Sequence, residues 1–207
     1  MSLANYRTLG RSGLAVSPLA LGTMTFGTAR WGTSEDDSKA VFNAYVDAGG
    51  NLIDTADVYS AGRGEEMVGK FIAERSLRDR IVLATKSGFS AGQGPHNGGN
   101  GAKHIFRAVE GSLQRMQTDY IDLYWIHVWD SITPAEELLE TMTTLVRSGK
   151  IRYWECRTRQ LGILPRLPRL QLFVACQSLL RCSTSIPSPI ATLKRSMSLW
   201  QKSLGSA

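Results

Sequence analysis

Residues 81–86 read Ile-Val-Leu-Ala-Thr-Lys, an apolar run that ends in a lysine, and this stretch decides how the rest of the chain is interpreted. Such a run is typical of a strand buried on both faces, as in a parallel sheet covered by helices. Lysine is seldom buried without a partner, so Lys86 at the end of a core strand indicates a task beyond packing.

Strand and helix patterns alternate on both sides of this run. Strands are predicted at 19–22, 52–53, 81–84, 121–126 and 151–154, and helices at 35–48, 65–75, 102–116 and 134–146. In the first helix we expect an inward stripe made of Ala40, Val41, Ala44, Tyr45 and Ala48. The alternation predicts an α/β fold with a parallel sheet, and both doubly wound sheets and (β/α)₈ barrels fit it.

The positions of the polar residues favour the barrel. Asp54, Lys86 and His127 each stand at or just past the carboxyl end of a different predicted strand. Barrels of this type collect their catalytic groups at that end of the strands. We therefore expect an incomplete (β/α)₈ barrel of the TIM type, with about five β/α units within residues 1–154.

Tyr59 follows Asp54 closely and joins these residues as a fourth candidate. Three of the four have an ordinary structural explanation, as a turn or cap aspartate, a core tyrosine and a structural histidine, and Lys86 is the hardest to explain in this way. All of these explanations would have to coincide at one rim of one sheet. A shared functional site is the simpler hypothesis.

Six segments of the chain resemble the aldo-keto reductase family: 6–10, 21–24, 53–59, 85–86, 119–127 and 149–154. They occur in the order and spacing of the family, and the resemblance as a whole extends over nearly all of residues 4–154. The resemblance implies a (β/α)₈ barrel that reduces aldehydes and ketones with NADPH.

The resemblance also implies a role for each polar residue. Tyr59 would donate a proton to the substrate, and Lys86 would favour the tyrosinate that this leaves. Asp54 would orient and neutralise Lys86. His127 would hydrogen-bond the substrate oxygen and stabilise its developing negative charge.

The cofactor would lie at the end of the first barrel strand. Gly22, Thr23 and Met24 match the cofactor-lining segment of the family, and Asp54 would border the same site. The loop 88–101 contains six glycines and would lie over the mouth, where it would help to select the substrate. A loop disordered in solvent is the alternative.

Residues 155–207 differ from the preceding part in charge. They contain eight Lys or Arg residues and a single acid, Glu155, against sixteen basic and seventeen acidic residues in 1–154. All three cysteines also lie there. The chain therefore divides into an aldo-keto reductase-like partial barrel at 1–154 and a basic, irregular tail at 155–207.

Composition excludes several other classes of protein. No run approaches the roughly 20 apolar residues that cross a bilayer, so no membrane partner is expected. Three cysteines are too few for a disulfide scaffold, and no Cys/His spacing indicates a metal site. The tail has no folded DNA-binding motif, which argues against a nucleic-acid partner. We expect a cytoplasmic protein with a small-molecule carbonyl substrate, and the oligomeric state stays open.

A shift of reading frame after the Trp154 codon would explain the tail. Codons built from the last base of one residue and the first two of the next permit Gly-Val-Ser-Asp-Thr-Pro-Ala from Trp154 to Leu161, with the glycine forced. That reading resembles the continuation of the family. The shifted reading from Thr192 to Ala207 permits an acidic amphipathic helix.

On this hypothesis the barrel keeps open edge strands, so we expect weak turnover or none from this chain. A non-catalytic NADPH-binding regulatory subunit and a dead truncated fragment are the alternatives to an enzyme.

Independent sequencing of the gene and its transcript across the Trp154 codon is expected to show one base gained or lost. An uninterrupted frame in both reads would remove the hypothesis and make the basic tail genuine. If such a tail bound nucleic acid, its affinity would fall steeply with salt.

Overall fold

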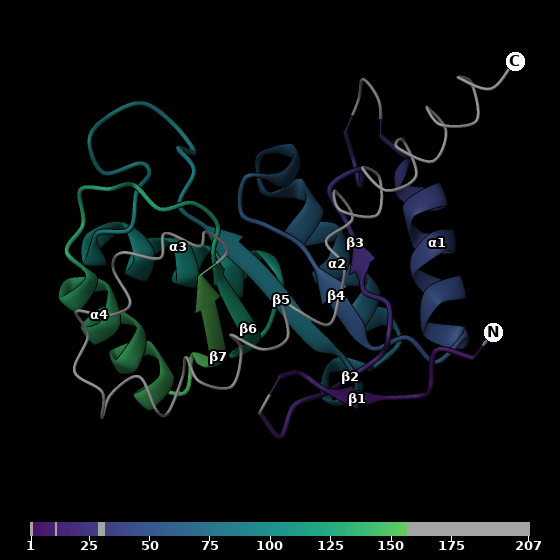
Figure 1. Ribbon diagram of the computed structural model, residues 1–207. Coiled ribbons are helices and arrows are strands. Elements are labelled where there is room, and N and C mark those ends of the chain that lie inside the picture. The colour runs from purple at the N-terminus through teal and green to yellow at the C-terminus, as the bar shows by residue number, and fades with distance from the viewer. Residues whose placement is uncertain (1, 11, 29–31, 157–207) are drawn as a thin grey trace, which may run out of the picture.

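The computed structural model describes residues 2–10, 12–28 and 32–156 (Figure 1). The tail predicted at 155–207 therefore lies outside the described residues from 157 onward. From residue 21 to the end of the described ranges, strands and helices alternate along the chain as the sequence predicts.

The sheet consists of parallel strands: β3 (Leu21–Gly22), β4 (Leu52–Asp54), β5 (Val82–Ser87), β6 (Ile121–Ile126) and β7 (Ile151–Cys156). Their order in space is their order in the chain. A doubly wound sheet would reverse its order at a switch point, whereas a barrel does not. The arrangement is therefore that of five consecutive barrel strands, and β3 and β7 each have one strand neighbour in the described part of the chain.

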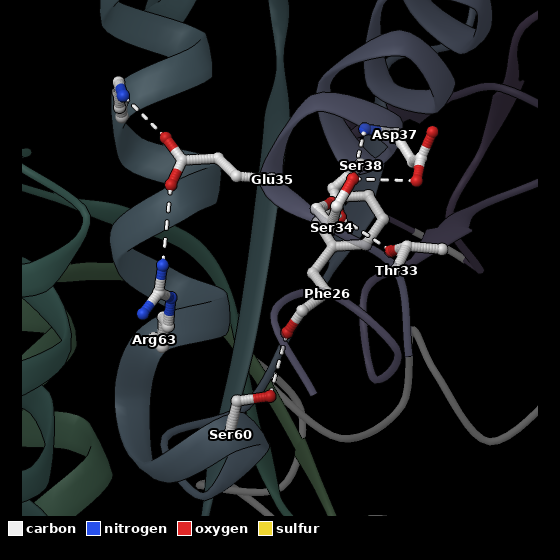
Figure 2. Close-up of polar contacts among 9 residues, drawn as sticks. Phe26, Thr33, Ser34, Glu35, Asp37, Ser38, Ser60 and Arg63 are labelled. Carbon is white, nitrogen blue, oxygen red and sulfur yellow. Dashed lines mark hydrogen bonds and ion pairs between the residues drawn. The ribbon is translucent and has the colours of Figure 1, made fainter. Parts of the chain in front are cut away.

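The helices are α1 (Glu35–Asp47), α2 (Arg63–Glu74), α3 (Ala102–Arg115) and α4 (Ala135–Arg147). Ser34 caps α1, because its Oγ accepts a hydrogen bond from the Asp37 backbone N–H at 3.1 Å (Figure 2). Across the described ranges, no helix combines the length and the apolarity that crossing a bilayer requires.

The inward face predicted for α1 is wrong except at Tyr45, which is half-buried and packs against the core. The helix buries Ser38, Phe42 and Val46, whereas Val41 is 45% exposed and the alanines of the predicted stripe are exposed. Phe42 turns inward because it packs on Phe71 of α2, with ring centroids 5.5 Å apart. One large aromatic ring thus outweighs several small side chains in setting the rotation of the helix.

The first strand is shorter than the predicted 19–22. Leu19 is 59% exposed, and its carbonyl accepts hydrogen bonds from the hydroxyls of Ser17 and Tyr45, each at 2.8 Å. The segment before β3 is therefore bonded to side chains and pairs with no strand in the described structure.

A short antiparallel hairpin, β1 (Arg7–Thr8) and β2 (Ala15–Val16), precedes the sheet and was not predicted. Leu9 and Val16 of this region pack against Val82, Ala84 and Leu123 on the inner face of the sheet. Figure 1 shows the hairpin near the amino ends of β4 and β5. It covers the end of the inner face opposite the strand carboxyl ends.

The corrected rotation of α1 predicts different effects of two neighbouring substitutions. Phe42→Ala is expected to lower the free energy of unfolding by about 3–5 kcal/mol, because a fully buried ring is lost. Val41→Ala, the control, is expected to change it by less than about 0.5 kcal/mol. Urea unfolding followed by circular dichroism measures both, and equal losses would contradict the assigned face.

Candidate active site

Lys86, at the carboxyl end of β5, is the centre of the site. Its Nζ donates to Asp54 Oδ2 at 2.7 Å, to the Thr55 carbonyl at 2.6 Å and to the Tyr59 hydroxyl at 3.4 Å. Only 4% of the residue is exposed. These three acceptors match the three N–H bonds of an ammonium group, so the buried charge is fully bonded.

The register of the sheet places the ion pair. Asp54 ends β4 and lies opposite Ala84 of β5, and Ala84 and Lys86 share the inner face because side chains alternate along a strand. The Asp54 side chain is 32% exposed, in contrast to its lysine partner. The lysine of the ion pair is therefore buried, whereas the aspartate is partly exposed to solvent.

Tyr59 is held by a strained turn, the short 3₁₀ helix η1 (Tyr59–Gly62). Ser60 and Ala61 both adopt the left-handed conformation, with φ of 50° and 56°. Such backbone persists only where the surroundings impose it. Here the Ser60 hydroxyl donates to the Phe26 carbonyl at 2.8 Å and shares a 2.8 Å hydrogen bond with the Thr28 hydroxyl (Figure 2 shows the first of these).

His127 follows β6 directly, and its backbone N–H donates to the Ser87 carbonyl at 2.9 Å. Its ring lies edge-on to that of Tyr59, with centroids 6.2 Å apart. The Phe89 ring also lies edge-on to the imidazole, with centroids 4.5 Å apart, and Phe89 is 45% exposed. The structure thus brings the predicted histidine to the tyrosine, and the start of the loop 88–101 lies beside the histidine.

Comparison with known proteins places this geometry in a family. A family model described as "Aldo/keto reductase family" matches residues 18–179. The chain belongs to the aldo/keto reductase family. This family has the TIM-barrel fold and generally uses NAD(P)H, so the described sheet and helices are part of such a barrel.

Several relatives of known name are similar to the chain. Norsolorinic acid reductase A of Aspergillus parasiticus is 42% identical over 164 residues, which cover 73% of this chain and 42% of that protein. Aldo-keto reductase YhdN of Bacillus subtilis is 41% identical over 148 residues, or 71% of this chain and 45% of that protein. A probable voltage-gated potassium channel subunit beta of Oryza sativa subsp. japonica is 39% identical over 149 residues, or 72% and 45%. The chain spans less than half the length of these relatives.

The segment expected to line a nicotinamide cofactor is partly accessible. Met24 is 51% exposed, and a Cβ placed on Gly22 would meet no atom within 4 Å. Thr23 has no exposed surface, and its N–H and hydroxyl both donate to the Asp54 carbonyl, at 3.0 and 3.2 Å. The open space at Gly22, which lies opposite Asp54 in the sheet, leaves room for a ligand, while Thr23 ties the segment to β4.

One group of polar residues behind the site was missed by the sequence analysis. Glu65 of α2 has no exposed surface and bonds Thr85 and Arg115, and Asp57 is buried close to them. The available signal was Asp57 itself, an acid between the apolar residues Ala56 and Val58. Glu65 gave none, because acids are ordinary in the first turn of a helix.

The strained turn predicts opposite effects of two adjacent substitutions. Ser60→Ala is expected to destabilise the fold by about 1 kcal/mol, since the turn loses its hydrogen bonds to the loop after β3. Ala61→Gly is expected to stabilise it by up to about 1 kcal/mol, because glycine adopts a positive φ without strain. Thermal unfolding of each variant measures the difference, and an unchanged midpoint for Ser60→Ala would show that the loop does not hold the turn.

Proposed function

We propose that this chain carries the catalytic group of an NADPH-dependent reductase of small aldehydes or ketones. The observation that supports the proposal is the contact of one buried ammonium, Lys86, with both Asp54 and Tyr59, with His127 beside the phenol ring. Family membership supports an oxidoreductase, and the choice of NADPH over NADH belongs to the proposal.

In this proposal Tyr59 delivers the proton to the substrate oxygen. A phenol is a weak acid at neutral pH, with an ordinary pKa of about 10 in the free amino acid, so a cation is needed to stabilise the anion that it leaves. The Lys86 ammonium is 3.4 Å from the hydroxyl and 4.9 Å from the ring centroid. Asp54 keeps that ammonium in place at 2.7 Å and balances its charge.

The bound cofactor would supply the hydride, while the protein positions it and the carbonyl. Gly22 and Met24 would contact the cofactor, and Asp54 would border it from the neighbouring strand. His127 would donate a hydrogen bond to the substrate oxygen. Because His127 is only 9% exposed, that bond would form where water competes little and charge stabilisation is strong.

We propose further that this chain alone turns over slowly, whereas no turnover at all would favour one of the alternatives given below. Strands β3 and β7 each have a single strand neighbour in the described ranges, and the match spans less than half of each compared relative.

A second candidate function is that of a cofactor-binding subunit without turnover. The observation that favours it is the similarity to a protein named as a probable potassium channel subunit beta. Both candidates predict cofactor binding, and only the enzyme predicts turnover. A chain that neither binds the cofactor nor turns over would be a non-functional fragment.

The decisive variant is Tyr59→Phe, which removes only the hydroxyl. Turnover of aldehydes is expected to fall by about 10²–10⁴-fold, the usual contribution of a general acid, while cofactor affinity stays unchanged. NADPH oxidation with a panel of aldehydes measures the first, and tryptophan fluorescence during cofactor titration measures the second.

Tyr6→Phe is the matched control, because Tyr6 is 47% exposed and its hydroxyl donates a hydrogen bond to the Gly49 carbonyl at 3.1 Å, away from the site. Turnover that survives Tyr59→Phe would refute the assigned proton donor. Cofactor binding without turnover in the unmodified chain would favour the subunit function instead.

A further inference from the structure

A second cluster of charged residues lies on the opposite face of the sheet from the site. Thr85 precedes Lys86 on β5, so the two side chains point to opposite faces of the sheet. On the helix side, Glu65 accepts hydrogen bonds from the Thr85 hydroxyl at 2.5 Å and from Arg115 Nε at 2.6 Å. Glu65 has no exposed surface, so its charge depends on these partners.

Asp57 adds a second carboxyl to this cluster. It lies between Asp54 and Tyr59 in the chain, and its backbone N–H donates to the Lys86 carbonyl at 3.1 Å. The residue is 8% exposed, and within the described residues its Oδ1 is buried without a hydrogen-bond partner. Burying an ionised carboxylate oxygen that has no hydrogen-bond partner costs free energy, and this cost is avoided when the carboxyl group stays protonated.

The charged or titratable groups that face Asp57 come from four elements: Glu65 from α2, Arg115 from α3, Lys86 from β5 and Tyr124 from β6. Burial raises the pKa of Asp57 to about 7, and the negative charge of Glu65 acts in the same direction. The positive charge of Arg115, a hydrogen bond from the Val58 backbone N–H and the positive charge of Lys86 oppose the shift. Both cations are already engaged, Arg115 with Glu65 and Lys86 with Asp54.

We propose that Asp57 is a positioning residue, whose protonated carboxyl holds the Tyr59 turn against Lys86 and whose ionisation loosens that turn. The mechanism is local. An ionised Asp57 would place a second anion beside Glu65 without a cation of its own, and its escape toward water would move the backbone two residues before Tyr59. The consequence for catalysis rests on the proposed function, whereas the titration and the movement of the turn do not.

The direction of the pH dependence follows from the ordinary pKa of 3.8 for an aspartate. The folded state holds this proton more tightly than the unfolded state does. The stability that Asp57 contributes is therefore complete below about pH 4, is lost progressively up to about pH 7, and stays lost above it. Asp57→Asn keeps the shape of the protonated side chain at every pH.

The test is urea unfolding of the full chain and of Asp57→Asn between pH 4 and 9. Above pH 7 the folding equilibrium constant of the variant is expected to exceed that of the parent by between about ten-fold and a thousand-fold. The advantage should vanish near pH 4. A difference that does not change with pH would overturn the proposal.

Asp130→Asn is the matched control. Although burial opposes it, hydrogen bonds from the backbone N–H groups of Thr133 and Asn100 lower the pKa of Asp130. Asp130→Asn is expected to lower the free energy of unfolding at neutral pH, whereas Asp57→Asn is expected to raise it.

Hydrogen exchange at pH 8 separates positioning of the turn from a general effect on stability. The lower global stability of the parent accelerates exchange in every protected segment, so the turn is compared with α3. The ratio of exchange rates of residues 57–64 to those of α3 should be at least ten-fold higher in the parent than in Asp57→Asn. An equal ratio in the two proteins would overturn the local mechanism. If the parent turns over, its rate should fall above pH 7 and that of the variant should not. A parent without turnover would count against the proposed function, and unfolding and exchange would still decide the role of Asp57.

Discussion

A buried ammonium group governs the arrangement of this molecule. Burying the Lys86 charge costs free energy that only close, well-oriented acceptors offset. The sequence supplies those acceptors from the end of the neighbouring strand and from the turn that follows it, at Asp54, Thr55 and Tyr59. β4 and β5 must therefore pair in one register, because a slip by one residue would turn the lysine to the other face. An ion pair of this kind is weak as a source of stability and strong as a constraint on geometry.

Strand β5 carries a polar side chain on each of its two faces. Its inner face carries Lys86 toward the rim, and its outer face carries Thr85 toward Glu65 and the helices. The turn that bears Tyr59 is bonded to both sides: the Asp57 N–H reaches β5, and the Ser60 hydroxyl reaches the loop after β3. The position of the phenol is therefore a property of three segments that are distant in the sequence.

The sequence predicted the features that depend on continuous burial. The strand at 121–126 was predicted with the bounds that the structure has, because five of its six residues are apolar and four of the six are buried. The same reasoning led to the strand-end positions of Asp54, Lys86 and His127, and the structure brings these together with Tyr59 at one rim. Their catalytic roles stay proposals.

Features that depend on partners far along the chain could not be predicted. β1 and β2 have two residues each, too few for any periodicity. The rotation of α1 is set by Phe71, a residue of another helix. Glu65 looks like an ordinary acid at the start of a helix until Arg115, fifty residues later, is placed beside it. Tertiary contact, and no local pattern, buries its charge.

The β1–β2 hairpin has a practical consequence. It packs at the amino ends of the strands, whereas the ionisable side chains of the site gather at the carboxyl ends. A dye, a surface tether or a fused carrier joined to the hairpin would therefore lie away from the carboxyl ends of the strands. The hairpin is thus the suitable place for an attachment that leaves the proposed site unaltered.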